Sequence, residues 1–182
     1  MWTVPNLLSL ARLPLAAALF ALIAWHLWPA ALTVFLLAAV TDWLDGWWAR
    51  TFDQGSALGR ALDPLTDKVL ICGAFIFLVR VPGAGLEPWM VTLVVARELL
   101  VTGLRGMVES AGKEFGADWF GKLKTVLQMA ALVAILVAQS FRLSSAEDTV
   151  IDVVQTGLIW AMLAATVGSL VQYTVKAVQV LR

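Results

Sequence analysis

The chain has 182 residues, 60% of them hydrophobic and 14% charged, with a net charge of zero and a mean hydropathy of +0.84. Soluble proteins carry about 25% charged residues, so this composition indicates a membrane protein, and the zero net charge gives no support for a nucleic-acid partner. The only cysteine is Cys72 and the only histidine is His26, which excludes a disulfide framework, cysteine metal cages and histidine-based triads.

Six apolar segments follow one another along the chain, each close to the roughly 20 residues that cross a bilayer as a helix. They are predicted at residues 7–25, 30–50, 59–81, 89–107, 120–141 and 149–178. The connectors are short, and Arg12 favours a retained anchor over a cleaved signal for the first segment. The sequence therefore predicts an all-α, polytopic integral membrane protein with six transmembrane helices in one domain, residues 1–182.

The basic residues predict the orientation of these segments, because cytoplasmic ends of membrane helices are rich in Lys and Arg. If the N-terminus is cytoplasmic, all thirteen Lys and Arg residues except Arg80 and Arg142 fall on the cytoplasmic side. Several of the nine tryptophans lie near predicted helix ends, as in an interfacial belt. Both termini are therefore expected in the cytoplasm.

Residues 41–69 hold five of the thirteen acidic residues. Asp42 and Asp45 are three apart and Asp63 and Asp67 are four apart, so each pair shares one face of a helix. The short loop between these two segments predicts that they run antiparallel and side by side, which would bring the four carboxylates together. Four uncompensated charges in a low dielectric would protonate, whereas hard divalent cations would neutralise them. Oxygen donors suit Mg²⁺ or Mn²⁺, with Ca²⁺ also open, and four carboxylates balance two such ions.

Small residues interleave with these aspartates, namely Gly46, Ala49 and Gly59. Glycine in a helix interior is about 1 kcal/mol less favourable than alanine, so its presence indicates close approach of another group. Arg50 offers a planar fork suited to phosphate. Single Asp residues are often helix caps, and Gly or Ala often serve helix packing. The combination favours a ligand site.

This pattern resembles the signature of the CDP-alcohol phosphotransferases, with every position filled: Asp42-x2-Asp45-Gly46-x2-Ala49-Arg50-x8-Gly59-x3-Asp63-x3-Asp67. The resemblance implies a six-helix membrane enzyme, usually a homodimer, with a two-metal site that opens to the cytoplasm. Such enzymes transfer a phosphatidyl-type group from a CDP-linked donor to an alcohol and release CMP.

Three further stretches narrow the resemblance: PNLLSLARL near the start, ARELLVTGLR at 96–105 and FGKLKTVLQM at 120–129. These stretches look like those of the bacterial family members that make phosphatidylglycerophosphate from CDP-diacylglycerol and sn-glycerol 3-phosphate in the cytoplasmic membrane. Ser9 departs from the Thr that is common in relatives but keeps the hydroxyl. Residues 109–119 vary among relatives, and no role is carried over to them.

The resemblance also implies roles for individual residues. Asp42, Asp45, Asp63 and Asp67 would hold two Mg²⁺ or Mn²⁺ ions on the diphosphate of the donor, and Asp67 would take the proton from the 1-hydroxyl of glycerol 3-phosphate. No Ser, Cys or His stands out as a nucleophile, which favours direct displacement. The nucleotide would contact Asn6, Ser9, Asp42, Asp45, Gly46, Ala49, Arg50 and Gly59.

An anionic acceptor requires basic residues nearby. Glu98, Thr102, Arg105 and Glu109 form one stripe at helical spacing, and Gly121, Lys124 and Gln128 form another. Arg97 lies too deep in its segment for snorkelling alone to explain it. We expect Arg97, Arg105 and Lys124 to bind the glycerol phosphate, with positive-inside anchoring as the alternative. The roles of Lys68, Lys113 and Lys122 stay open.

Other functions are compatible with parts of this pattern. Within the family, the acceptor could be inositol phosphate, serine or phosphatidylglycerol, whereas the basic stripes disfavour choline. Magnesium-dependent membrane prenyltransferases also use aspartate pairs, but they lack the Gly-x2-Ala-Arg segment. An ion carrier would place carboxylates near the middle of several spans. The metal preference, the acyl chains and the dimer interface are not determined by the sequence.

Overall fold

The computed structural model describes residues 4–52, 57–110, 112, 119–143 and 149–181. Over these ranges the chain is all-helical, which confirms the predicted all-α class and the six helices. Their bounds lie within a few residues of the predicted segments: α1 (Val4–Ala24), α2 (Trp28–Phe52), α3 (Ala57–Leu78), α4 (Pro88–Ser110), α5 (Trp119–Leu143) and α6 (Thr149–Leu181).

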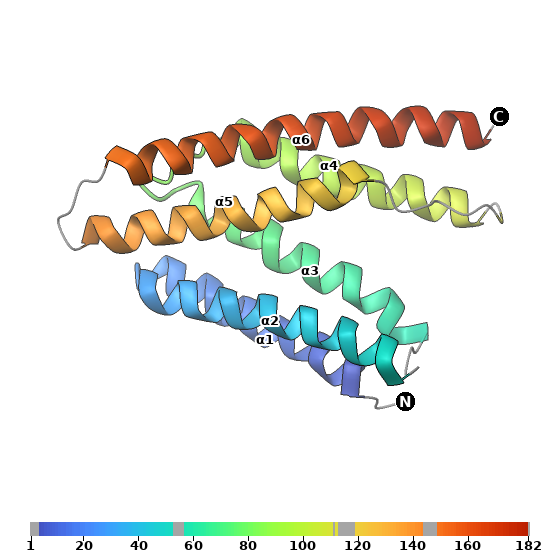
Figure 1. Cartoon of the computed structure of the whole chain (residues 1–182), viewed down its shortest axis with the longest axis horizontal. Helices are drawn as coiled ribbons and strands as arrows, with labels where there is room; N and C mark the ends of the chain where they lie inside the picture. The colour runs from blue at the N-terminus through green and yellow to red at the C-terminus, as the bar shows by residue number, and fades with distance from the viewer. Residues whose placement is uncertain (1–3, 53–56, 111, 113–118, 144–148, 182) are drawn as a thin grey trace.

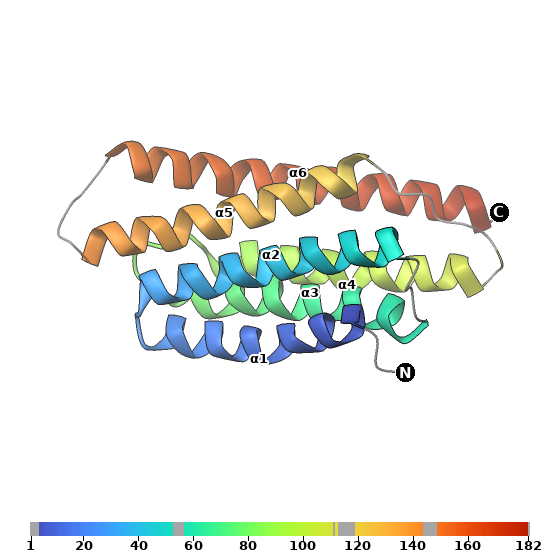
Figure 2. The same ribbon diagram turned by 60° about the horizontal axis from the view of Figure 1, so that its bottom comes forward.

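The helices lie roughly along one long axis and form two groups of three (Figures 1 and 2). In the first group, α1 packs against both α2 and α3. In the second group, α6 packs against both α4 and α5. Contacts of α2 with α5, and of α3 with α4 and α5, join the two groups. The line between the groups is where the polar residues of the site meet.

The predicted side-by-side packing of α2 and α3 is wrong for the described residues, over which these two helices make no direct backbone contact. Helix α1 contacts both of them instead. A short connector fixes only the distance between two helix ends, and it does not require the helices to touch along their length. The carboxylates of α2 and α3 therefore meet through a residue of α1.

A tight turn separates α1 from α2. His26 adopts a left-handed backbone with φ of 57°, and the amide of Leu27 donates to the carbonyl of Leu22 at 2.9 Å. Both features are typical of a helix that ends in a Schellman-type turn. Pro29 then lies in the first turn of α2, where its missing amide proton is not needed.

At the same end of the molecule, the connector between α3 and α4 is tied to α5 and α6. Gln139 of α5 donates to the carbonyl of Pro82 at 3.0 Å, and Gln155 of α6 donates to the carbonyl of Gly83 at 3.1 Å. Arg142 of α5 donates to the same carbonyl of Gly83, whose φ of 78° favours glycine. These bonds satisfy the backbone of the connector and close this end.

All six helices contribute to one apolar core, with one fully buried side chain from each in Leu19, Phe35, Phe75, Val94, Leu132 and Met162. A second, smaller cluster joins α4 to α6 through Val101, Val108, Tyr173 and Ala177. This second cluster lies toward the C-terminal ends of α4 and α6, next to the polar residues of the site.

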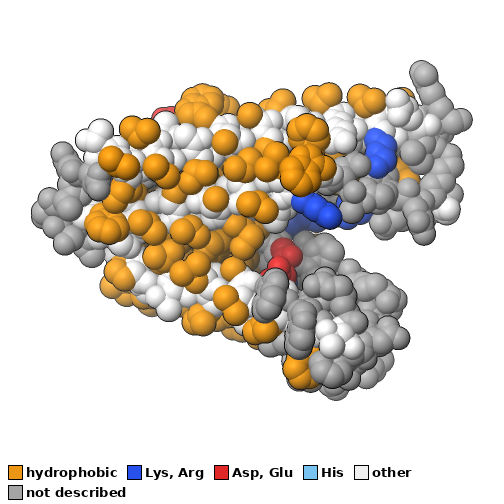
Figure 3. Space-filling view, viewed as in Figure 1, with side chains coloured by type: hydrophobic (Ala, Val, Ile, Leu, Met, Phe, Trp, Pro, Cys, Tyr) orange, Lys and Arg blue, Asp and Glu red, His pale blue; other side chains and the backbone are white. Residues whose placement is uncertain are grey.

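The outer surface carries many large apolar side chains (Figure 3), such as Val150 and Val153 of α6, which are 69% and 66% exposed. Among the described residues, two helical segments are long and apolar enough to cross a membrane, Trp119–Arg142 and Thr149–Gln179. Two shorter apolar segments lie in α1 and α2. Continuous apolar surface of this kind is typical of a membrane protein.

Candidate active site

A cavity of about 180 Å³ lies between the two helix groups. Helices α2, α3, α4 and α5 line it with both apolar and polar side chains: Phe35, Ala38, Ala39, Asp42, Asp67, Lys68, Leu70, Ile71, Cys72, Glu98, Lys124, Thr125, Gln128 and Met129. At the end of the molecule opposite the α3–α4 connector, acidic side chains face basic ones across an opening (Figure 3). The cavity thus brings two of the four predicted metal ligands, Asp42 and Asp67, and one predicted acceptor residue, Lys124, to a shared space.

Arg12 of α1 joins the two aspartates of the cavity. Its Nη1 lies 2.9 Å from Oδ1 of Asp42 and donates to Oδ1 of Asp67 at 2.5 Å. The Arg12 side chain is 1% exposed, whereas those of Asp42 and Asp67 are 47% and 40% exposed. The two carboxylates therefore converge on one buried cation while part of each faces open space.

This geometry fits a divalent cation on Asp42 and Asp67. The two Oδ1 atoms lie 2.9 and 2.5 Å from the same atom, Nη1 of Arg12, so they are at most 5.4 Å apart. Mg²⁺ binds oxygen at about 2.0–2.1 Å, so two oxygens on one ion lie up to about 4 Å apart. A shift of little more than an ångström would let both carboxylates hold one ion. Oxygen donors without sulfur or imidazole are the set that Mg²⁺ and Mn²⁺ prefer.

The other predicted metal and nucleotide residues fall where the structure describes the helix but no side chain. Asn6 and Ser9 lie in α1, and the remaining six lie in α2 or α3: Asp45, Gly46, Ala49, Arg50, Gly59 and Asp63. Their side chains lie outside the described part of the molecule. Among the side chains that are described, no group of three or more carboxylates, imidazoles or thiols converges.

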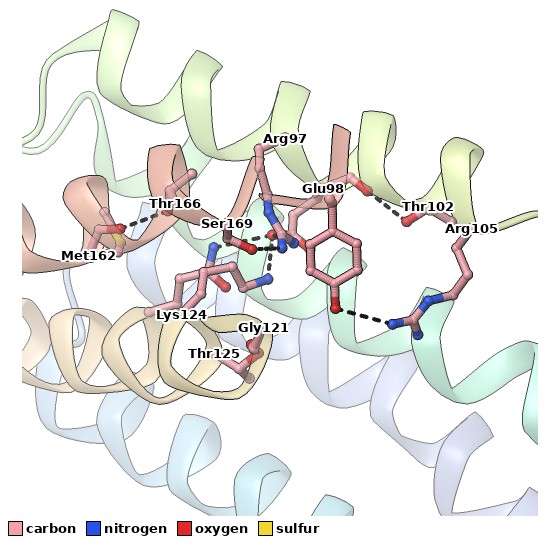
Figure 4. Close-up of polar contacts among 12 residues, drawn as sticks. Arg97, Glu98, Thr102, Arg105, Gly121, Lys124, Thr125, Met162, Thr166 and Ser169 are labelled. Carbon is pink, nitrogen blue, oxygen red and sulfur yellow. Dashed lines mark hydrogen bonds and ion pairs between the residues drawn. The ribbon is translucent and has the colours of Figure 1, made fainter. Parts of the chain in front are cut away.

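A buried cluster of charged residues lies beside the cavity (Figure 4), which its members Glu98 and Lys124 also line. Glu98 of α4 accepts from Nζ of Lys124 at 2.5 Å and from Nη1 of Arg97 at 3.1 Å. Nε2 of Gln128 lies 3.5 Å from the same carboxylate oxygen. All four residues are buried. Glu98 therefore holds two predicted acceptor residues, one from its own helix and one from α5.

Helix α6 completes this cluster with two residues. Nη2 of Arg97 donates to the hydroxyl of Ser169, and the Arg97 guanidinium carbon lies 5.4 Å from the centre of the Tyr173 ring. The hydroxyl of Tyr173 also lies 3.4 Å from Nη2 of Arg105. Tyr173 thus contacts both arginines of α4, of which Arg97 is buried and Arg105 is exposed.

The buried part of this cluster has an excess of positive charge. Arg97 and Lys124 are both buried cations, and Glu98 is the one buried carboxylate that contacts them in the described structure. Burial of an unbalanced charge is unfavourable, and such groups concentrate at functional sites. The ring of Tyr173 compensates part of the excess through a cation–π contact. An anionic ligand would compensate the rest.

Of the basic residues that the sequence left open, Lys68 lines the cavity beside Asp67. Lys122 is exposed on α5, and Lys113 lies outside the described residues. The predicted stripe residue Thr102 donates to the backbone carbonyl of Glu98, one turn earlier, at 2.6 Å. Thr102 therefore satisfies its own helix and is not needed to explain the cavity.

The sequence analysis missed the positions of Arg12, Ser169 and Tyr173. A basic residue near the start of a membrane span is usually interpreted as a charge that flanks the membrane. In the structure, Arg12 lies within α1 and its side chain is buried. Ser169 and Tyr173 follow Thr166 at helical spacing on an otherwise apolar helix, and Tyr173 is the only tyrosine of the chain. That polar stripe was the available signal for a role of α6.

Comparison with known proteins agrees with the site. Residues 2–168 match the model of the CDP-alcohol phosphatidyltransferase family. A protein of Escherichia coli K12 is 34% identical over 172 residues, which cover 89% of this chain and 92% of the relative. A Cereibacter sphaeroides protein is 34% identical over 92% of this chain and 76% of its own length, and one of Bacillus subtilis is 41% identical over 57% and 52%. All three are named CDP-diacylglycerol–glycerol-3-phosphate 3-phosphatidyltransferase.

Proposed function

Since the chain belongs to the CDP-alcohol phosphatidyltransferase family, we propose that it transfers the phosphatidyl group of CDP-diacylglycerol to sn-glycerol 3-phosphate and releases CMP. The relatives at 34% identity over most of the chain carry the name of this reaction. The observation that carries the proposal is the shared cavity, in which Asp42 and Asp67 face Lys124. A carboxylate site for metal ions and a basic site for an anionic acceptor are the two parts that this reaction requires.

In this proposal the aspartates Asp42, Asp45, Asp63 and Asp67 would hold two Mg²⁺ or Mn²⁺ ions at the site of the donor diphosphate. When bound, such ions polarise phosphoryl oxygens and neutralise the charge that develops on the leaving CMP. The convergence of Asp42 and Asp67 on one cation supports the assignment for this pair. Asp45 and Asp63 are assigned from the family signature.

Asp67 is the proposed general base. Its side chain is 40% exposed and lines the cavity that also contains Lys124, so an acceptor held there would present its hydroxyl close to this carboxylate. Asp67 would take the proton from the 1-hydroxyl as that oxygen forms a bond to the phosphorus that bears diacylglycerol. The bond from this phosphorus to the CMP oxygen breaks in the same displacement, and no enzyme-bound phosphatidyl group forms.

Arg97, Arg105 and Lys124 are proposed to bind the phosphate of the acceptor. Lys124 reaches the cavity directly, and Arg97 contacts the same Glu98 carboxylate. Arg105 is exposed and joins the group through Tyr173, so it would meet the acceptor as it enters. The positive excess of the buried cluster supports a phosphate as the ligand.

The nucleotide is proposed to lie along the ends of α1, α2 and α3, against Asn6, Ser9, Gly46, Ala49, Arg50 and Gly59, together with Asp42 and Asp45. The cavity has a volume of about 180 Å³. Pockets that bind drug-sized ligands are larger, at about 300–1,000 Å³. The cavity therefore suits the reacting headgroups, and the acyl chains of the donor would stay in the lipid.

We further propose six membrane-spanning helices with both termini in the cytoplasm, a bacterial cytoplasmic membrane as the location, and a homodimer. The six helices, the apolar surface and the distribution of basic residues support the topology. The family resemblance supports the location and the dimer. Cysteine-accessibility labelling from the two sides of the membrane tests the orientation, and light scattering on the detergent-solubilised protein tests the dimer.

The deciding experiment is CMP release by the purified protein in mixed micelles that contain CDP-diacylglycerol. Glycerol 3-phosphate, inositol phosphate, serine, phosphatidylglycerol or no acceptor is added, each with Mg²⁺, Mn²⁺ or EDTA. CMP release that requires both a metal and glycerol 3-phosphate is expected. Release with a different alcohol would preserve the mechanism and replace the acceptor, and no release with any alcohol from folded protein would overturn the proposal.

A further inference from the structure

Arg12 is the residue of the site whose position the predicted chemistry does not explain. It is among the largest fully buried side chains of the described structure, although arginine is rarely buried unless it is paired. Its helix, α1, lies against both α2 and α3, which make no direct backbone contact with each other over their described residues. Arg12 therefore sits where a single side chain can reach a carboxylate from each neighbour.

The contacts of Arg12 involve the atoms that a metal would use. Nη1 lies 2.9 Å from Oδ1 of Asp42 and 2.5 Å from Oδ1 of Asp67, so one nitrogen is shared by both oxygens. A divalent cation that bridged Asp42 and Asp67 would approach the same side of the same two carboxylates. Two cations at bonding distance from shared oxygens would repel each other strongly in this partly buried place.

We propose that Arg12 is a displaceable internal cation, whose guanidinium competes with the divalent ion for Oδ1 of Asp42 and Asp67. This inference rests on the metal role that the proposed function gives to these aspartates. Arg12 holds the carboxylates of α2 and α3 close together against their mutual repulsion, and it withdraws when an ion binds. It is a positioning residue, because it acts on the reaction through the two aspartates.

Competition predicts an unusual result: removal of Arg12 tightens metal binding. An ion pair with partly exposed partners is worth roughly 1 kcal/mol, so its loss corresponds to an apparent Kd for Mn²⁺ that is about three- to tenfold lower. A residue that merely helped to assemble the site would have the opposite effect, since its loss would separate the carboxylates and weaken binding.

The test is titration of the full chain, purified in detergent micelles, with Mn²⁺, using electron paramagnetic resonance to measure free Mn²⁺. The variants are Arg12→Gln, Arg12→Met and the charge-conserving Arg12→Lys. Lys68→Gln removes a positive charge from the same cavity without the contact to both oxygens, and Arg80→Gln removes one from the distant end. We expect the Gln and Met variants to bind Mn²⁺ about three- to tenfold more tightly, with Arg12→Lys and Arg80→Gln near the wild type.

Thermal unfolding of the same variants gives a second readout. Arg12→Gln is expected to unfold at a lower temperature than the wild type in EDTA, and the difference should shrink at saturating Mn²⁺, because the ion then balances both carboxylates. If Arg12→Met does not fold, the Gln and Lys variants decide the outcome.

Two kinds of result separate the failure of this inference from that of the proposed function. If the wild type binds Mn²⁺ and the Kd of Arg12→Gln is equal to or higher than that of the wild type, the competition alone is overturned. The competition is also overturned if Lys68→Gln tightens binding as much as Arg12→Gln, because the effect would then be general electrostatics. Folded wild-type protein that binds no Mn²⁺ would overturn the metal assignment on which both proposals depend.

Discussion

The phenol oxygen of Tyr173 on α6 lies against Gly121 on α5, and a β-carbon at position 121 would stand 2.9 Å from that oxygen. The same tyrosine places its ring beneath Arg97 and its hydroxyl near Arg105. Gly121 thus leaves the space in which one ring can contact both arginines of α4. Three helices meet at this point, and the absence of a side chain on one of them permits the meeting.

Gly121→Ala is therefore expected to displace the Tyr173 hydroxyl and to raise the KM for glycerol 3-phosphate. The nearest atom is the end of a side chain that can turn, so the fold should be preserved. We expect an increase of about threefold or more, the size of one weakened hydrogen bond, without a change in the KM for CDP-diacylglycerol. Gly157→Ala, which meets no atom within 4 Å, is the matched control for CMP-release kinetics. An equal effect of both substitutions would contradict the role of Gly121.

Substitutions of Tyr173 itself should separate its two contacts. Tyr173→Phe keeps the ring beneath Arg97 and removes the hydroxyl near Arg105, so the acceptor KM should rise by about two- to fivefold. Tyr173→Leu removes both contacts and should have a clearly larger effect, since a buried cation–π contact is worth about 2 kcal/mol. The measurement is the acceptor dependence of CMP release. Equal KM values for the two variants would show that the ring contributes nothing to the acceptor site.

Glu98→Gln is expected to destabilise the protein, because it leaves the buried cations Arg97 and Lys124 without their carboxylate. Breaking a buried ion pair in this way lowers the free energy of unfolding by about 3–5 kcal/mol. The double variant Glu98→Gln/Lys124→Met removes both charges of the shorter pair and should recover part of the loss. Thermal unfolding in micelles, with and without glycerol 3-phosphate, provides the comparison. Glu98→Gln should gain more from the anion than the wild type does, and a smaller gain would contradict the excess positive charge.

Gly73→Ala should disturb the contact between α1 and α3. A β-carbon at position 73 would lie 2.1 Å from the ring of Phe20, which is stacked on Phe77 with 5.0 Å between the ring centres. Overpacking of this kind costs about 1–3 kcal/mol, against a gain of about 1 kcal/mol in helix propensity. The melting temperature should therefore fall, and CMP release should fall with it because α1 carries Arg12. Gly103→Ala meets no atom within 4 Å and should not be destabilising.

Asp67→Asn should abolish turnover while the protein stays folded. Loss of a general base lowers rates by about 10²- to 10⁴-fold, and loss of a metal ligand adds to this. Removal of metal from the wild type with EDTA should have a comparable effect that excess Mg²⁺ or Mn²⁺ reverses. Single-turnover CMP release measures both. Near-normal activity of Asp67→Asn would remove this residue from both proposed roles.

Much of the fold could be predicted from the sequence because helix length and apolar composition are local properties. The six segments were located to within a few residues, since VPGAG and the residues around His26 break the helices. The packing of α2 and α3 could not be predicted in the same way. Which helix lies between two others depends on side-chain packing along their whole length, and the short connector carries no information about it.

The site shows the same division. The spacing of the aspartates identified Asp42 and Asp67, which the structure places in one cavity, and the basic stripes identified Lys124 in that cavity. Arg12 was missed because a basic residue near the start of an apolar segment has an ordinary explanation in membrane orientation. Only the three-dimensional position of α1 between two acidic helices shows that its charge is used inside the protein.

Helix α6 has 33 residues, which at 1.5 Å each make a rod of about 50 Å. The hydrocarbon layer of a bilayer is only about 30 Å thick, so in the proposed topology a good part of this rod extends beyond it. With the C-terminus in the cytoplasm, we expect the extension to begin near Tyr173, which contacts the buried Arg97 on one side and the exposed Arg105 on the other. Glycerol 3-phosphate could then be captured from water and keep much of its hydration until it meets the donor. Because α6 would cross the boundary between lipid and water, glycerol 3-phosphate would react from the water and CDP-diacylglycerol from the lipid, and neither would have to leave its own phase.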